Sequence, residues 1–322
     1  MAACGNGGGT ASQNSESPDA SVDCGTTSHA PIVFAAALDG QAATDLYVME
    51  AHGQPQRLTT TPGAELYPAW SPDRTQVAFV RDQHLYVLDV DTGVERMLAE
   101  HVGRDRTISG AAWSPDGSRL VYPYPRDRWL VDYGADGFID ESYDTTLHFV
   151  NADGTNDVAY AEPPGPSFNP SLGPGTLVEP AWSSTNVLAF IEADDCPDCA
   201  GGQVYVLSNP DGSDYRFIEP HDLALAPLYP RHDLDWSPDA TRWVFSSLAS
   251  TPEGWTTLIA TRSVDEPDTY VALTGNGASV PRYAPDAESI AFQRDDGLYL
   301  MNADGTDQHR IVSATNVAGL DW

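Results

Sequence analysis

The chain contains no lysine: its 16 basic residues are all arginine, set against 47 aspartates and glutamates in 322 residues. A formal net charge of −31 repels nucleic acid and anionic lipid headgroups, which excludes both as partners. Two explanations of this acidity remain open. A high-salt habitat would screen the self-repulsion, or acidic clusters would collect divalent cations. The acidic residues are spread along the whole chain, which favours adaptation to salt.

Long apolar runs are also missing. No stretch of about 18 apolar residues occurs, so no transmembrane helix is expected. Hydrophobic residues still make up 41% of the chain, and its 8 tryptophans and 14 tyrosines suit an all-β protein. The Gly-x-Ser-x-Gly and His-Glu-x-x-His motifs, the phosphate loop and the dinucleotide fingerprint are all absent. The sequence therefore offers no positive evidence of catalysis.

Cysteine is scarce, with four residues in the chain. This number fits an oxidising compartment. Cys196 and Cys199 form a single Cys-x-x-Cys in a segment rich in proline and glycine. A local disulfide that staples a loop fits this context better than a redox pair, which needs a following helix, or half of a zinc site.

Residues 1–30 are rich in Gly, Ser, Asn and Asp and lack periodicity, which predicts a flexible linker. Cys4 follows small residues, as does the lipid-bearing cysteine of a bacterial lipoprotein signal. The alternative is an incidental cysteine. The lipoprotein interpretation predicts a periplasmic or outer-surface protein of a bacterium, a monomer that contacts the membrane only through a lipid anchor.

A repeat runs through residues 31–322. Its core is Trp-Ser-Pro-Asp, followed by a short apolar run such as Val77-Ala-Phe-Val. A second run then ends in a polar turn, as in Leu298-Tyr-Leu-Met-Asn-Ala-Asp-Gly. The aromatic anchors of the repeat are Trp70, Trp113, Trp182, Trp236, Tyr283 and Trp322. The shorter intervals between anchors match the ~40–50 residues of known blade repeats.

Both turns have a clear chemistry: Pro presets φ, Asp bonds its own backbone, and Gly accepts a positive φ. Strand, turn, strand, loop, strand, turn and strand make one four-stranded antiparallel sheet, which is a propeller blade. Six anchors predict six blades. The first blade has three strands at the N-terminus, and Val317–Trp322 at the C-terminus is expected to supply its innermost strand, which hides the sheet edges.

These repeats resemble the TolB-like propeller family, whose motif is Trp-Ser-Pro-Asp-Gly followed by Ile/Val-Ala-Phe and then Leu-Tyr-x-Met-Asn-x-Asp-Gly. The resemblance covers about 31–322. It implies a six-bladed propeller with a binding or scaffold role outside the cytoplasm. The chain shows no small N-terminal α/β domain such as TolB carries, so the resemblance does not extend to TolB's role in its envelope complex.

The longest connections are expected on one face of the propeller, at 101–110, 123–146, 162–179, 191–203 and 219–234. Residues 132–144 within them resemble an EF-hand-type calcium loop. The predicted calcium ligands are Asp132, Asp136, Phe138 through its carbonyl, Asp140, and Glu141 or Asp144 as the closing carboxylate. Gly134 and Tyr143 depart from the usual pattern, and the alternative is an acidic solvated loop.

Another set of polar residues is expected around the central opening or on the long-loop face beside it. These candidate ligand-binding residues are Glu65, Tyr67, Arg104, Glu179, Tyr229, Arg231, His232 and Arg282. They would either recognise a ligand or fill the channel with hydrogen bonds. The sequence thus predicts a calcium-binding propeller that engages a protein, peptide or glycan. The alternative is a metal-dependent polysaccharide lyase or hydrolase with its site in the central funnel.

Overall fold

The computed structural model describes residues 30–38, 40–100, 102, 110–132, 139–160, 176–193, 203–214, 216–218, 228–251, 254–266, 269–275 and 277–322. Within these ranges, only the backbone is described for 126–132, 139–144, 176, 192–193, 203–207, 216–218, 228–232 and 251. All regular elements in this part of the chain are β-strands, which confirms the all-β prediction. None of its segments is a helix able to cross a membrane.

The strands of the described chain form six four-stranded antiparallel sheets, each of which runs from an innermost strand outward. The first contains β24 (Leu320–Asp321), β1 (Ile32–Ala36), β2 (Asp45–Met49) and β3 (Gln56–Arg57). The second contains β4 (Glu65–Trp70), β5 (Gln76–Arg81), β6 (His84–Asp89) and β7 (Glu95–Ala99). The third contains β8 (Ala112–Trp113), β9 (Arg119–Asp132), β10 (Ile139–Asn151) and β11 (Val158–Ala159).

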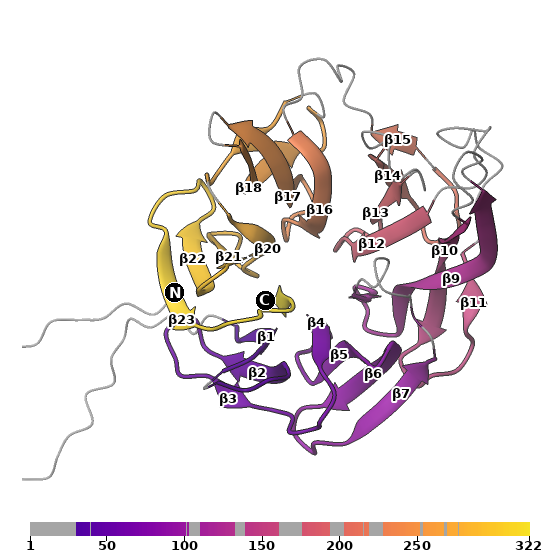
Figure 1. Ribbon diagram of the computed structural model, residues 1–322, viewed down its shortest axis with the longest axis horizontal. Coiled ribbons are helices and arrows are strands. Elements are labelled where there is room, and N and C mark those ends of the chain that lie inside the picture. The colour runs from indigo at the N-terminus through magenta and orange to yellow at the C-terminus, as the bar shows by residue number, and fades with distance from the viewer. Residues whose placement is uncertain are drawn as a thin grey trace, which may run out of the picture.

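The remaining three sheets follow the same order. The fourth contains β12 (Thr176–Trp182), β13 (Leu188–Ala193), β14 (Gln203–Ser208) and β15 (Arg216–Ile218). The fifth contains β16 (Leu228–Trp236), β17 (Arg242–Thr251), β18 (Gly254–Ser263) and β19 (Val271–Ala272). The sixth contains β20 (Ser279–Tyr283), β21 (Ser289–Arg294), β22 (Gly297–Asn302) and β23 (His309–Ser313). Figure 1 shows the sheets around a central opening, as the blades of a propeller.

The chain closes the ring with its own two ends. Strand β24 pairs with β1 in the register Val33↔Asp321 and Phe34↔Leu320. The Trp322 indole N–H donates to the Ala30 carbonyl over 2.6 Å. The prediction that the C-terminal strand completes the first blade is confirmed, and β24 covers the edge of β1 that would otherwise be open.

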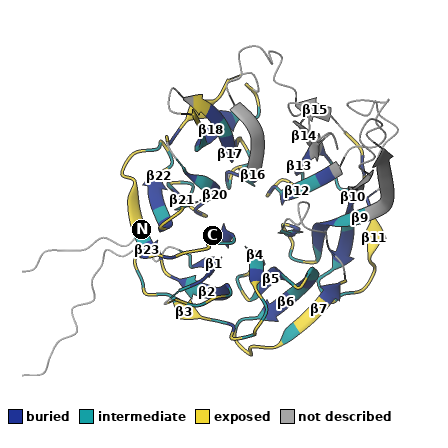
Figure 2. Ribbon diagram, in the orientation of Figure 1, coloured by how far each residue is buried: buried dark blue, intermediate teal, exposed yellow. Residues whose placement is uncertain are grey.

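The core lies between the blades rather than within any one of them. In β5, Phe79 packs toward the first blade with Val33, while Ala78 packs toward the third blade with Trp113. Both faces of the strand are covered, so its sequence is continuously apolar instead of alternating. Burial of one such phenylalanine stabilises the fold by roughly 2–3 kcal/mol. Figure 2 shows buried residues on the inner strands and exposed ones on the outer strands β3, β7 and β11.

The tryptophan anchors join neighbouring blades, as their position before each turn predicts. The Trp113 indole N–H donates to the Ala69 carbonyl of the preceding blade over 3.1 Å. The Trp236 indole N–H donates in the same way to Ala181 over 3.3 Å. These two rings therefore bury their apolar surface and satisfy their one polar group across the same interface, whereas the Trp182 indole N–H donates to Asn186 in its own turn.

The Ser-Pro-Asp turns form the hydrogen bonds that their residues predict. The Asp116 carboxylate accepts the Ser114 hydroxyl at 2.7 Å and the Ser118 amide N–H at 3.0 Å. These bonds favour the charged form and lower the pKa of Asp116 to about 2. The same arrangement recurs in the turns of Ser71 with Asp73 and of Ser237 with Asp239.

Two of the long connections differ from the prediction. The segment 123–146 lies mostly on β9 and β10, which extend the hairpin of the third blade up to the pair Asp132↔Ile139, with a register shift between Tyr143 and Thr145. Residues 228–234 likewise belong to β16. The first stretch is rich in aromatic and β-branched residues, which favour pairing over a free loop. The other predicted long connections lie mainly outside the described residues.

Candidate functional site

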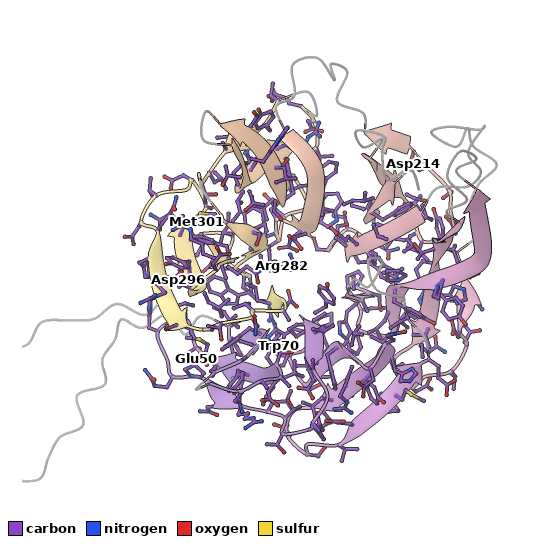
Figure 3. The ribbon with its side chains drawn as sticks, viewed as in Figure 1. Glu50, Trp70, Asp214, Arg282, Asp296 and Met301 are labelled. Carbon is purple, nitrogen blue, oxygen red and sulfur yellow. The ribbon has the colours of Figure 1, made fainter. Side chains whose placement is uncertain are left out.

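A cavity of about 740 Å³ lies at the centre of the ring and is lined by residues of the innermost strand of each blade or of the segment leading into it. Proline, alanine and tryptophan supply 12 of its 27 lining residues. Its polar lining residues include Tyr67, Glu179, Asp233, Asp235, Arg282, Gln293 and Asp321. Figure 3 shows Arg282 and Trp70 near this central opening. Tyr67, Glu179 and Arg282 thus lie where the sequence predicts.

The cavity wall is shaped by a backbone irregularity that recurs three residues before the aromatic anchors. The pairing register shifts beside this position, for example between Leu66 and Ala69 in β4. The residues at this position are Gly319, Tyr67, Gly110, Glu179, Asp233 and Val280. All except Gly110 have a positive φ, from 50° upward. Such bulges redirect a side chain and carry strain, most of all for a β-branched residue such as Val280.

Tyr67 has room at this position because both neighbouring blades carry glycine there. A Cβ on Gly319 would lie 2.9 Å from the Tyr67 Cα, and one on Gly110 would lie 3.0 Å from the Tyr67 Cβ. The Tyr67 amide N–H also donates to the Ala318 carbonyl over 2.8 Å. Strand β4 is therefore held closely against its neighbours, with the phenol ring in the cavity wall.

Carboxylates hold the opposite side of the ring together by accepting backbone N–H groups from the next blade. Glu179 Oε2 accepts from Asp233 N at 2.5 Å, and Asp233 Oδ2 accepts from Val280 N at 3.3 Å and from the Ser246 hydroxyl. Asp235 Oδ2 accepts from Tyr283 N at 2.8 Å. Asp321 Oδ2 accepts from Trp70 N at 2.7 Å, where the last strand meets the second blade.

The electrostatic balance of the cavity is negative. The described lining includes four carboxylates and one guanidinium, that of Arg282, whose Nη1 donates to the Pro281 carbonyl at 2.7 Å and the Asp233 carbonyl at 3.3 Å. Burial raises the pKa of Asp235 to about 6; the charge of Arg282 opposes this rise and that of Asp321 adds to it. Burial also raises the pKa of Tyr67, with further contributions from Asp233 and Glu179.

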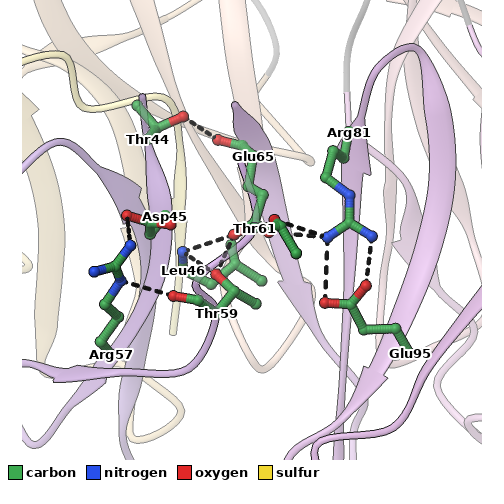
Figure 4. Close-up of polar contacts among 9 residues, drawn as sticks. All are labelled: Thr44, Asp45, Leu46, Arg57, Thr59, Thr61, Glu65, Arg81 and Glu95. Atoms are coloured by element: carbon green, nitrogen blue, oxygen red, sulfur yellow. Dashed lines mark hydrogen bonds and ion pairs between the residues drawn. The ribbon is translucent and has the colours of Figure 1, made fainter. Parts of the chain in front are cut away.

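Glu65 was expected beside the opening, but it lies between the first two blades and has no exposed surface (Figure 4). Its carboxylate accepts from the Leu46 amide at 3.0 Å, the Thr61 hydroxyl at 2.7 Å and Arg81 Nη1 at 3.1 Å. Arg81 also forms an ion pair with Glu95. The carboxylate is satisfied by protein groups, so Glu65 joins two blades and does not line the cavity.

Several candidate residues have no described side chain. Tyr229, Arg231 and His232 lie on β16, and Asp132, Asp140, Glu141 and Asp144 lie on β9 or β10, by backbone alone. Arg104, Asp136, Phe138, Cys4, Cys196 and Cys199 lie outside the described residues. Among the side chains that are described, no group of three or more His, Cys, Asp or Glu is arranged to hold a metal ion.

Asp233, Asp235, Gln293 and Asp321 line the cavity but were not among the predicted binding residues. Asp235 and Asp321 directly precede their anchors, where the second, third and fourth blades carry Ala69, Ala112 and Ala181. A comparison of that single position across the repeat would have found both aspartates. Gln293 gave no such signal, because it lies on β21 and reaches the cavity only in the folded ring.

Comparisons with known proteins agree with this architecture. The model of the dipeptidyl peptidase IV N-terminal region matches residues 38–127. The structure of a TolB from Agrobacterium tumefaciens has a TM-score of 0.58 and 16% identity over 92% of each chain. The chain has the TolB-type propeller fold. A search of curated proteins found no match.

Two other solved structures show how widely this fold is shared. An oligogalacturonate lyase in complex with manganese has a TM-score of 0.55 and 18% identity, over 88% of this chain and 74% of the lyase. A nidogen/laminin complex chain has a TM-score of 0.59 and 9% identity, over 90% of this chain and 97% of that one. Similarity at these identities establishes the TolB-type fold and leaves function to the site.

Proposed function

We propose that the chain is an extracytoplasmic binding propeller that engages part of a protein, peptide or glycan in its central cavity. The observation that carries this proposal is the cavity of about 740 Å³, which the innermost part of every blade helps to line. A volume of this size accommodates a few side chains or a small ligand. The rigid strands around it, joined by backbone hydrogen bonds to carboxylates, provide a preorganised site.

Filling the cavity tests this proposal. Peptide and glycan arrays would be probed with the wild type, with Ala112→Trp, which places a large ring in the cavity wall, and with Val158→Trp on the outer strand of the same blade. Partners of the wild type should bind Ala112→Trp at least about tenfold more weakly and Val158→Trp normally. Unchanged binding to a folded Ala112→Trp variant would place the site elsewhere.

The polysaccharide lyase is the second candidate, favoured by the structural likeness to oligogalacturonate lyase with manganese. Its metal would have to be held by residues outside the described side chains, such as His232. The test is the release of unsaturated oligogalacturonates from polygalacturonate, with and without manganese. Product that disappears when a chelator is added would replace the binding proposal with this one.

We further propose that calcium binds the hairpin segment 132–144 and stabilises the propeller. The ligand set is the one that the sequence predicts: Asp132, Asp136, the Phe138 carbonyl, and Asp140 with Glu141 or Asp144. Calcium at about one hundred times its Kd should stabilise the fold by roughly 2.7 kcal/mol. Asp140→Asn should abolish the calcium-dependent rise in Tm. A Tm that chelator leaves unchanged, with no calcium in elemental analysis, would contradict the proposal.

The location outside the cytoplasm rests on the cysteines. Lipid on Cys4 would tether the propeller through the linker of residues 1–30, and a Cys196–Cys199 disulfide would staple its loop. Mass spectrometry of the protein isolated from its native cells checks both, as an acyl mass on a Cys4 peptide and as a thiol count before and after reduction. A free thiol at Cys4 in membrane-extracted protein would contradict the tether.

A further inference from the structure

The charged groups in the described lining of the central cavity are mostly carboxylates. Four of them are carboxylates, those of Glu179, Asp233, Asp235 and Asp321. The one described cation of the lining, Arg282, already donates through Nη1 to two backbone carbonyls. A ligand that enters the cavity therefore meets net negative charge from the described lining.

Gln293 adds an independent observation. Its Nε2 donates to the Ser279 hydroxyl over 3.2 Å, while its Oε1 is buried and accepts no hydrogen bond from the described residues. Buried acceptors in proteins are nearly always satisfied, and an unsatisfied one beside a cavity marks a place for a donor. Gln293 lies on the blade whose Val280 amide bonds Asp233, so this acceptor continues the arc of Glu179 and Asp233.

Tyr67 supplies the other wall. Its ring belongs to the cavity lining and stands in a gap that Gly110 and Gly319 leave open. Glu179 and Asp233 line the same cavity, and their charges add to the effect of burial in raising the pKa of Tyr67. An aromatic face combined with carboxylates is the environment that recognises organic cations.

We infer that the cavity binds an organic cation, an ammonium or guanidinium group with several N–H donors, between Tyr67 and the arc of Glu179, Asp233 and Gln293. This inference rests on the proposed binding function and names its ligand class. A cationic side chain of a protein or peptide partner and a free polyamine share this chemistry. An acidic oligosaccharide does not, because it would place its carboxylates against those of the cavity.

The test uses fluorescence anisotropy with a labelled peptide of alternating arginine and serine, and its glutamate–serine counterpart. Spermidine serves as a competitor. Binding is measured at high salt, because a protein of net charge −31 attracts any polycation to its surface at low salt. The arginine peptide should bind and the glutamate peptide should not. Displacement by spermidine at equal concentration favours a polyamine as the natural ligand, and its failure favours a polypeptide; either result supports the inference.

Matched variants place the cation in the cavity. Glu179→Gln keeps an acceptor for the Asp233 amide but removes the charge, and Gln293→Leu removes the free acceptor. Each should weaken arginine-peptide binding, Glu179→Gln by about tenfold. Glu266→Gln removes an equal charge at an exposed position away from the cavity and should bind as the wild type does. If Glu179→Gln fails to fold, Asp321→Asn, which keeps the acceptor for Trp70, replaces it.

Two outcomes would overturn the inference in different ways. If Glu179→Gln, Gln293→Leu and Glu266→Gln all weaken arginine-peptide binding equally and slightly, the peptide is held by the general surface charge and the inference is wrong. If instead a neutral or acidic ligand binds and is lost in Ala112→Trp, the proposed function stands and its ligand class is wrong. If no array ligand and neither peptide responds to Ala112→Trp, the binding function of the cavity fails as well.

Discussion

The shape of the cavity depends on the residue three places before each anchor. Two of these residues are glycines that flank Tyr67, and two are carboxylates on the opposite side of the ring. A propeller built from identical repeats would have a symmetric channel. In this chain the residue at this one position differs between blades, which makes one side of the channel aromatic and the other acidic. The left-handed backbone at five of the six positions holds these residues at the opening.

Glycine substitutions separate the effect of backbone strain from the effect of close contact. Gly254→Ala tests a positive φ alone, because nothing lies within 4 Å of its Cβ. Gly110→Ala tests a contact alone, and Gly319→Ala combines both. The expected losses of unfolding free energy are about 1 kcal/mol for Gly254→Ala and about 1–3 kcal/mol for Gly110→Ala.

Gly319→Ala should lose the most, about 3 kcal/mol or more, because its Cβ meets backbone that cannot move aside. Denaturant titration of the three variants measures the order. Equal losses for Gly254→Ala and Gly319→Ala would show that contact with Tyr67 does not constrain the ring.

Asp235 should make stability depend on pH in an uncommon direction. Its pKa of about 6 in the folded chain lies above the ~3.9 of an unfolded aspartate, so the folded state binds the proton more tightly. The free energy of unfolding should therefore decrease as pH rises from about 4 to 6 and stay lower above it. Arg282 and Asp321 are the charged groups that act on Asp235, the first lowering its pKa and the second raising it.

Asp235→Asn keeps an acceptor for the Tyr283 amide and removes the ionisation. It should raise the free energy of unfolding at pH 7–8 by roughly 1–2 kcal/mol and leave it unchanged near pH 4. Thermal unfolding across this pH range measures the difference. A variant that is less stable at pH 7–8 would show that the negative charge of Asp235 is itself needed in the ring.

At the scale of elements, the strands are stable because each blade covers its neighbours. The second strands bury most of their described side chains, whereas the outer strands β3, β11 and β19 are exposed along their length. Strands β24 and β8 are the shortest of the innermost strands. In β24, Leu320 is nevertheless 1% exposed, and the Asp321 carboxylate links the strand to the second blade. Strand β24 thus stabilises the ring through burial and through the Asp321 link as well as through its two residue pairs with β1.

Trp322→Ala should therefore destabilise the whole ring. The indole is 5% exposed and donates to Ala30, so its removal leaves a cavity at the joint of the two chain ends. We expect a loss of about 3–5 kcal/mol in unfolding free energy. Trp255→Ala, at a position 66% exposed, is the matched control and should change it by less than about 0.5 kcal/mol. Similar losses for both variants would contradict the closure role.

At the scale of the whole molecule, charge is the dominant feature. A net charge of −31 on one propeller produces repulsion that opposes the compact state. The described ion pairs are few and mostly local, such as Arg310 with Asp296 and Arg57 with Asp45, so they offset little of it. The same field gives the central cavity its preference for cations.

Salt should consequently stabilise the protein. Raising NaCl from about 0.01 M to 0.15 M shortens the Debye length from about 30 Å to 8 Å and screens most of the long-range repulsion. We expect Tm to rise most steeply over this interval, equally with NaCl and KCl and in the presence of chelator. A Tm independent of both salts would show that the acidic surface is not under electrostatic strain.

The sequence by itself determined the features that depend on residues close together in the chain. The Ser-Pro-Asp turns, the apolar second strands and the position of the tryptophan anchors follow from local hydrogen bonding and from burial on both faces of a strand. The pairing of the C-terminal strand with β1 also followed, because an incomplete first blade and a surplus last strand have only each other as partners.

The tertiary structure alone decided which polar side chains share the cavity. Asp235 and Gln293 lie on different blades and meet only when the ring closes, and Glu65, which the sequence placed beside the opening, is instead bonded between two blades. A repeat pattern specifies the strand on which a residue lies. Whether its side chain then faces a neighbouring blade or the central opening depends on the bulges and on contacts between residues far apart in the chain. The bulges and these contacts therefore set the balance of charges and hydrogen-bond donors in the cavity.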